Sequence, residues 1–204
     1  PLIDRLRKYD ENEWCFRLAD ALQAIPEIET YMTERAERIA ISGAATLDQE
    51  MIVAKMQEDL SKHFPAGREL YPFQYVGVHF AQLAGGRCLI GDDMGVGKTI
   101  QAIAHIALNT DQLPALVVCP ASVKYNWAKE CRAWLPDMTV EALEGRKGVI
   151  PDADIIICNY DIISGRKDSL LDYGFNIVVC DESHYLKNIK AKRTASTLEV
   201  ASES

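Results

Sequence analysis

Apolar residues in this chain fall into two kinds of run, and each kind predicts a different element. Short, continuous apolar runs read as strands buried on both faces; they span Cys88–Ile90, Leu116–Cys119, Ala153–Cys158 and Asn176–Cys180, with a weaker one at Thr139–Leu143. Elsewhere apolar residues recur every three to four positions, as helices require, over Pro72–Leu83, Thr99–Leu108 and Val123–Trp134. Strands alternating with helices predict an α/β fold with a mostly parallel sheet and right-handed crossovers.

The first 60 residues read as helices without intervening strands. Two sets of apolar residues have helical spacing, with Pro26 between them: Trp14, Leu18, Leu22 and Ile25, then Ile28, Met32 and Ile39. Thr46 and Gln49 form a capping-box pattern before a helix that carries Ile52, Met56 and Leu60. We therefore predict a helical extension over residues 1–65 and an α/β lobe over 66–204. The extension is an accessory domain's tail or a brace on the lobe, and we favour the brace.

A glycine-rich loop connects the first predicted strand of the lobe to a helix. It reads Gly91–Asp92–Asp93–Met94–Gly95–Val96–Gly97–Lys98–Thr99. Glycines let backbone N–H groups turn inward around an anion, and the helix N-terminus adds its positive end. In such a phosphate loop Lys98 reaches the β- and γ-phosphates and the Thr99 hydroxyl holds Mg²⁺. Asp92 stands where the general pattern has glycine, and an ordinary glycine-rich turn is the alternative interpretation.

Two adjacent carboxylates follow the last predicted strand, in the sequence Asp181–Glu182–Ser183–His184. Within a strand they would point to opposite faces, so they can share one pocket only where the chain leaves its pleat. Asp181 would hold Mg²⁺ through water, and Glu182 would polarise an attacking water. Taken alone, this pair is more often the start of a solvated loop. Together with the glycine loop it predicts a nucleoside-triphosphate site.

These two segments resemble motifs I and II of helicase superfamily 2 (the DEXH box), in its Swi/Snf-type branch, where Asp92 is the normal residue and Asp93 and Val96 are mild variants. Three further blocks are similar to that family in order and spacing: Leu70–Gln74, Leu116–Ser122 and Ile155–Asp161. Three tetrapeptides within these blocks are most similar to those of the annealing-helicase (HepA-related) subgroup. They are Tyr-Pro-Phe-Gln, Asp-Asp-Met-Gly and Asp-Glu-Ser-His. The resemblance covers about residues 68–197.

The resemblance implies a RecA-like P-loop NTPase lobe that binds ATP and Mg²⁺ at the carboxyl ends of its strands. It places adenine on Gln74, Mg²⁺ on Thr99 and Asp181, and water activation on Glu182, with His184 coupling the site to later motifs. It assigns phosphate binding to the loop residues Asp92, Asp93, Met94, Gly95, Val96, Gly97, Lys98 and Thr99. Lys98, Asp181 and Glu182 are the expected catalytic residues. Contacts to DNA would come from Pro120, Ser122, Lys124, Asn159 and Tyr160.

By resemblance, the parent protein is a DNA-dependent ATPase that moves along double-stranded or branched DNA and remodels or re-pairs it. The family's second lobe supplies an arginine finger, and Ser204 precedes motif III, so we expect this chain alone to bind ATP weakly and hydrolyse almost none. The alternatives are another superfamily motor (a restriction-system translocase or an RNA helicase), a signalling or transport NTPase, and an inactive lobe that serves as an interaction module.

Composition narrows these possibilities only slightly. The net charge is −8, and residues 1–60 account for −6 of it, with 13 acidic and 7 basic side chains. The near-neutral remainder neither favours nor excludes a nucleic-acid partner. Lys187, Lys190, Lys192 and Arg193 are predicted to lie on one helix, with a solvated face as the default and DNA contact as the minority interpretation.

The six cysteines contain no C-x-x-C pair, so we expect buried thiols in a reducing compartment and neither zinc nor disulfides. No apolar run is long enough to cross a bilayer, and the start lacks a signal-peptide pattern. We therefore expect an intracellular protein, in the cytoplasm of a prokaryote or the nucleus of a eukaryote. Because the first residue is proline, we expect either an excised piece or a chain whose first residues are missing from this sequence.

Overall fold

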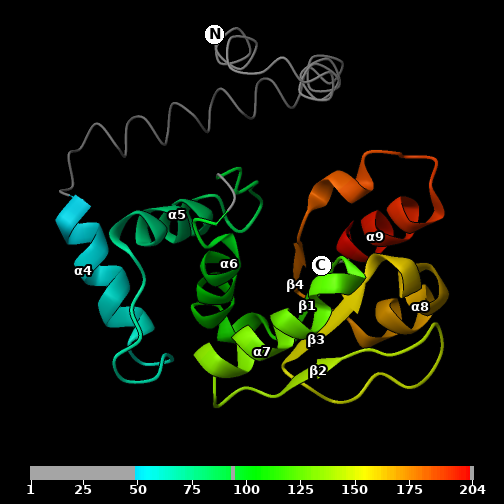
Figure 1. Cartoon of the computed structure of the whole chain (residues 1–204), viewed down its shortest axis with the longest axis horizontal. Coiled ribbons are helices and arrows are strands. Elements are labelled where there is room, and N and C mark those ends of the chain that lie inside the picture. Colours follow the sequence, from blue (N-terminus) through cyan, green and yellow to red (C-terminus); the bar gives the residue numbers. More distant parts are fainter. Residues whose placement is uncertain (1–48, 93–94, 203–204) are drawn as a thin grey trace, which may run out of the picture. The chain divides into compact units, whose positions relative to one another are not determined.

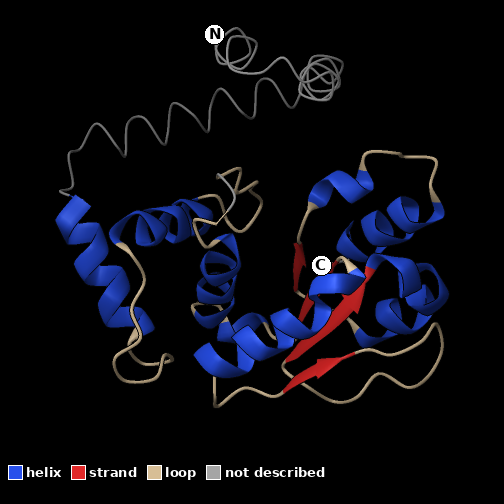
Figure 2. Cartoon of the chain, viewed as in Figure 1, coloured by secondary structure: helices blue, strands red, loops and turns tan. Residues whose placement is uncertain are grey.

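A parallel sheet organises the part of the chain that the structure describes. The computed structural model describes residues 49–92 and 95–202, and residues from Gln49 onward belong to one compact unit. Its strands are β1 (Ala115–Cys119), β2 (Val140–Ala142), β3 (Ile155–Asn159) and β4 (Ile177–Cys180), arranged in the order β2-β3-β1-β4 with every pair parallel (Figures 1 and 2). The predicted α/β class is confirmed, and these four strands match predicted runs.

Helices cover both faces of this sheet, which explains why β1 and β3 are buried along their whole length. The described helices are α4 (Gln49–Leu60), α5 (Pro72–Leu83), α6 (Lys98–Ala107), α7 (Lys124–Trp134), α8 (Tyr160–Tyr173) and α9 (Lys192–Ser202). Short 3₁₀ turns occupy Thr110–Gln112, Ala121–Val123 and Ser183–Leu186. The helix predicted at Pro72–Leu83 is confirmed at both ends.

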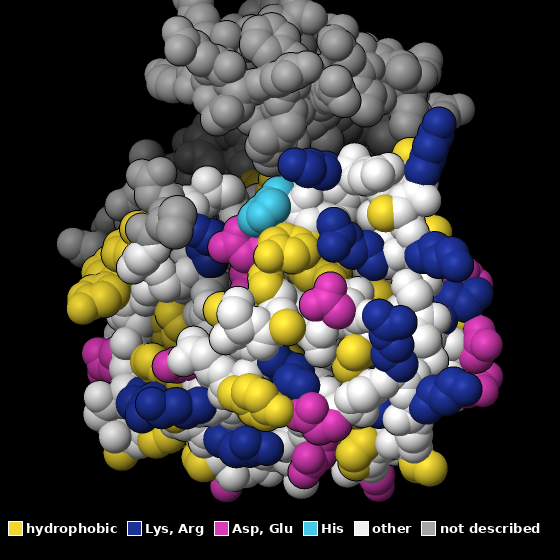
Figure 3. Space-filling model, turned by 45° about the vertical axis from the view of Figure 1, so that its right-hand side comes forward, with side chains coloured by type: hydrophobic (Ala, Val, Ile, Leu, Met, Phe, Trp, Pro, Cys, Tyr) yellow, Lys and Arg dark blue, Asp and Glu magenta, His cyan; other side chains and the backbone are white. Residues whose placement is uncertain are grey.

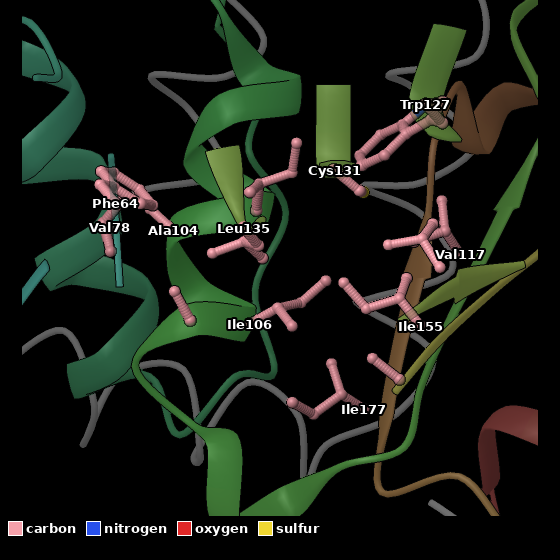
Figure 4. Close-up of a cluster of buried hydrophobic side chains, with 14 of the residues drawn as sticks. Phe64, Val78, Ala104, Ile106, Val117, Trp127, Cys131, Leu135, Ile155 and Ile177 are labelled. Atoms are coloured by element: carbon pink, nitrogen blue, oxygen red, sulfur yellow. The ribbon is translucent and has the colours of Figure 1, made fainter. Parts of the chain in front are cut away.

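The two faces of β1 belong to different apolar clusters. Ala115, Val117 and Cys119 pack with α5, α6 and α7, whereas Leu116 and Val118 pack with α8 and α9. Figure 4 shows the first cluster, in which Ile106 of α6 faces Val117 and Ile155 of the sheet. Strand alternation therefore divides the lobe into two cores and fixes α6 and α7 on the same side of the sheet.

Part of the predicted helical extension packs onto the lobe. Met56, Leu60 and Phe64 are buried in the same cluster as Tyr75 and Val78 of α5. Residues 49–64 thus pack against the lobe, and the brace that we favour for the extension stays a prediction. The helices predicted before them and the Thr46 cap lie outside the described residues, and the division at residue 65 stays a prediction. No helix in the described residues is long and apolar enough to cross a membrane.

The run Cys88–Ile90, predicted as a buried strand, is neither a strand nor buried. It pairs with none of the four strands, Leu89 is 61% exposed and Cys88 is exposed. An apolar run becomes a strand only when a neighbour satisfies its backbone N–H and C=O groups. In the described sheet β4 pairs only with β1, and the segment before the glycine loop has no strand beside it.

Two other local predictions are also wrong. The helix predicted over Val123–Trp134 begins one residue later, at Lys124, because the chain first makes the 3₁₀ turn Ala121–Val123 and the cap position falls on Val123. Lys187 and Lys190 do not lie on a helix, because α9 begins only at Lys192. In both cases the helix begins later than predicted, because a 3₁₀ turn comes before it.

The five described cysteine thiols fall into three groups by burial. Cys119, Cys131 and Cys158 are fully buried in the two cores, and burial raises the pKa of each thiol to about 12. Cys180, partly buried, has a pKa raised to about 11 for the same reason. Cys88 is exposed, contrary to the expectation of buried thiols.

We expect this difference to show in thiol labelling. The thiolate is the reacting form, so a pKa near 12 leaves almost none at pH 8, and burial also blocks access. A Cys15→Ser variant treated with an aromatic disulfide reagent at pH 8 should react promptly at Cys88, slowly at Cys180 and not at the other three. In denaturant all of them should react. Prompt labelling of Cys119, Cys131 or Cys158 in the folded chain would contradict the packing described above.

Candidate nucleotide site

The glycine loop opens directly into helix α6. Gly97, the cap residue, has φ +85° and ψ +42°, and Gly95 has φ +86°, both in the left-handed region that favours glycine. Among the described residues, no side chain caps the first turn of α6. The first backbone N–H groups of a helix lack partners within it, so this end of α6 can donate to an anion.

Lys98 is the first residue of α6, and its ammonium lies back across the loop. Its Nζ donates to the backbone oxygen of Asp92 at 2.7 Å, and the side chain remains partly exposed. Asp93 and Met94 lie outside the described residues. The lysine and the loop it follows are thus close together, as a phosphate-binding lysine requires.

Gln74, predicted to read adenine, reaches the same loop from α5. It is 5% exposed; its Oε1 accepts from the Tyr71 N–H at 2.9 Å, and its Nε2 donates to the Val96 carbonyl at 2.8 Å. A Cβ at Gly97 would lie 2.4 Å from this Nε2, so only glycine fits there. One amide proton and one lone pair of Gln74 remain for a base edge.

The acidic pair stands at the tip of β4, where the chain leaves the sheet. Glu182 has φ +51° and ψ +52°, the only positive φ of a non-glycine residue among those described. A non-glycine residue held there carries strain of about 1–3 kcal/mol, a feature that clusters at functional sites. The turn takes Glu182 out of strand alternation, as two carboxylates sharing one pocket require.

Asp181 accepts three hydrogen bonds, two on its carboxylate and one on its backbone oxygen. Trp127 Nε1 donates to Oδ2 at 2.8 Å, the Glu182 N–H donates to Oδ1 at 3.0 Å, and the Tyr160 hydroxyl donates to the backbone oxygen at 2.8 Å. Trp127 is 2% exposed and packs in the core on the α6 and α7 side of the sheet. Sequence patterns missed its second role, because helical spacing shows only which face is buried and not where an indole N–H points.

His184 lies beside the acidic pair and partly in solvent. Its Nδ1 is 3.1 Å from Oε2 of Glu182, and its ring is 5.0 Å from that of Tyr185. Tyr185 in turn stacks on Tyr160 at 5.3 Å. Burial raises the pKa of Tyr160, so its hydroxyl stays protonated and keeps donating to Asp181.

Most residues predicted to contact DNA are buried. Pro120 and Asn159 are buried, and so is Tyr160; only Ser122 is exposed. Lys124 is 6% exposed, and its ammonium donates to the Leu143 carbonyl at 2.8 Å and pairs with Glu144 at 3.0 Å. That engagement disfavours the DNA contact predicted for Lys124. Figure 3 shows one face of the molecule, on which basic side chains are scattered with acidic ones among them.

The residues present fit a magnesium–nucleotide ligand better than a metal alone. Among the described residues, no group of three or more His, Cys, Asp or Glu side chains could hold a metal ion unaided. Thr99 and Asp181 offer a hydroxyl and a carboxylate, and magnesium bound to nucleotide takes its other ligands from phosphates and water. The prediction that Lys98 and Asp181 face one ligand stays a prediction.

The fold and these two segments define a phosphate-loop α/β lobe with an acidic strand tip. The family model described as the SNF2-related domain matches residues 31–204, and the chain belongs to that family. A solved structure described as the Sulfolobus solfataricus SWI2/SNF2 ATPase core in complex with dsDNA superposes with a TM-score of 0.55 at 29% identity, over 63% of this chain and 29% of that one. The described sheet and helices are therefore part of such an ATPase core fold, and the family predicted from the motifs is confirmed.

Curated relatives agree with this assignment. The chain is 34% identical over 94% of its length to the Xenopus tropicalis SWI/SNF-related matrix-associated actin-dependent regulator of chromatin subfamily A-like protein 1. It is 36% identical over 62% of its length to the mouse DNA annealing helicase and endonuclease ZRANB3. It covers 22% and 13% of those proteins, respectively. The resemblance to the annealing-helicase subgroup is thus borne out at the level of relatives.

Proposed function

We propose that this chain is the ATP-binding lobe of a DNA-dependent ATPase that moves along double-stranded or branched DNA and remodels or re-pairs it. The observation that carries the proposal is the glycine loop at the start of α6, whose left-handed glycines and uncapped first turn suit a triphosphate. The relatives named above act on DNA or chromatin by their names, which supports an intracellular role for the parent protein.

Each side chain then has a distinct task. Lys98 exchanges its bond to the Asp92 carbonyl for the β- and γ-phosphates, and Gln74 uses its remaining donor and acceptor on adenine. Thr99 and Asp181 hold Mg²⁺, which when bound neutralises phosphate charge. Glu182 takes a proton from the attacking water, and His184 beside it couples the site to later motifs.

The proposal includes a limit on what this chain does alone. An arginine finger supplied from elsewhere contributes about three to five decades of rate in NTPases of this kind. We therefore expect the isolated chain to bind Mg-ATP and to turn over almost none.

The test has one measurement for each part of the proposal. A fluorescent ATP analogue with Mg²⁺ should bind the chain saturably and be displaced by ATP, with no phosphate released above background. The full parent protein should hydrolyse ATP faster when double-stranded or branched DNA is added than when RNA is added. Stimulation by RNA alone would favour an RNA helicase, and absence of any nucleotide binding would favour an inactive interaction module.

A further inference from the structure

A second buried glutamine, Gln101 on α6, holds the start of the glycine loop. Its Nε2 donates to Oδ2 of Asp92 at 2.9 Å, and the residue is 0% exposed. Asp92 itself is exposed and receives the Lys98 ammonium on its backbone oxygen. Asp92 is therefore hydrogen-bonded both to the buried amide of Gln101 and to Lys98, the lysine proposed to bind phosphate.

The two glutamines act on opposite ends of the loop. Gln101 binds Asp92 on one side of positions 93 and 94, and Gln74 binds Val96 on the other side. Both amides are more than nine-tenths buried, and they come from neighbouring helices that pack against each other. A loop fixed at both ends by buried side chains presents its backbone to a ligand in a restricted geometry.

Gln101 occupies its position at a cost to stability. Its Oε1 is buried and has no hydrogen-bond partner among the described residues. It lies against Gly77 of α5, where an added Cβ would come within 2.0 Å of that oxygen. A buried polar atom without a partner is destabilising, and an apolar side chain of the same length would avoid that cost. What the amide adds is its single bond to Asp92.

From this geometry we infer that Gln101 is a positioning residue for nucleotide binding: it fixes Asp92, and through the Asp92 backbone the place of Lys98, while Gly77 provides the space it needs. The inference rests on the proposed ATP site and goes beyond it, because it assigns a role to a fully buried side chain that acts through Asp92. It requires that loss of the amide weakens nucleotide binding while the fold becomes no less stable. A residue with a purely structural role would change both in the same direction.

The test compares Gln101→Met with a matched control on the same protein. Gln82 of α5 also has a buried amide nitrogen without a partner among the described residues, and that nitrogen, unlike Nε2 of Gln101, forms no hydrogen bond to Asp92. Both Gln101→Met and Gln82→Met should have a thermal midpoint equal to or above that of the unsubstituted chain. Only Gln101→Met should weaken binding of a fluorescent ATP analogue with Mg²⁺, by about tenfold, the effect of losing one hydrogen bond to a charged group.

Asp92 variants provide a second route that does not depend on how Gln101→Met folds, because Asp92 is exposed. Asp92→Ala should weaken binding as much as Gln101→Met, and the double variant should be no weaker than either single one. Unchanged binding in Gln101→Met, or additive losses in the double variant, would overturn the inference. If the unsubstituted chain bound no nucleotide, the proposed function would fail instead.

Discussion

Lys98→Ala should remove most of the affinity of this chain for Mg-ATP. The lysine contributes a charge-assisted hydrogen bond to phosphate, so we expect affinity to fall by about tenfold to a hundredfold. In the full parent protein ATP turnover should fall by about two to three decades, because the same charge stabilises the transferring phosphoryl group. Titration with a fluorescent nucleotide and a phosphate-release assay measure the two effects.

Lys129→Ala is the control for that experiment, because Lys129 is an exposed cation of α7 outside the glycine loop. It should bind nucleotide as the unsubstituted chain does, with the same unfolding midpoint. Equal binding by Lys98→Ala and Lys129→Ala would refute the phosphate-loop interpretation. It would leave only the α/β lobe and its family membership standing.

Glu182→Gln should separate binding from hydrolysis in the full protein. Gln has nearly the same shape and fits the left-handed backbone no worse, but it cannot accept a proton from water. We expect the affinity for Mg-ATP to stay within about threefold and the hydrolysis rate to fall by about two to four decades. Glu141→Gln, an exposed carboxylate in β2, should change neither quantity. A Glu182→Gln protein that still hydrolysed ATP would assign the general base elsewhere.

The sheet could be predicted because its strands correspond to apolar runs in the sequence. Runs such as Leu116–Cys119 are apolar at every position, and only a strand covered on both faces needs that pattern. Cys88–Ile90 has the same pattern but a different outcome, since pairing depends on a neighbouring strand that a run of residues does not specify. Helix α5 was predicted to the residue because Pro72 marks its first turn.

Helix α8 was missed for a physical reason. Its buried positions are Tyr160, Ile163, Arg166 and Leu170, so an arginine stands where the helical pattern calls for an apolar residue. Arg166 is 4% exposed, and its guanidinium donates to the backbone oxygens of Glu144, Gly145, Lys147 and Gly148. Burial of this charge is possible only because a distant loop turns four carbonyls toward it. No local pattern could have shown that arrangement.

The sequence pointed to the motifs of the candidate site but not to the side chains that hold them. Lys98, Thr99, Asp181 and Glu182 were singled out from residue types at known spacing, and their roles stay a prediction. Gln101, which holds Asp92, was not singled out, because a glutamine inside a helix is usually a solvated residue. Supports of this kind act through contacts between elements far apart in the chain, and these become visible only when the fold is known.

The bond from Trp127 to Asp181 gives the acidic strand tip an optical reporter of its own. Indole emission shifts in wavelength and intensity when its N–H gains or loses a charged partner. Phenylalanine at 127 would fill nearly the same volume, yet it would remove the indole donor from Oδ2 of Asp181 and with it the optical signal. The indole ring of Trp127, which packs in the core, can therefore report changes at the Asp181 carboxylate through its fluorescence.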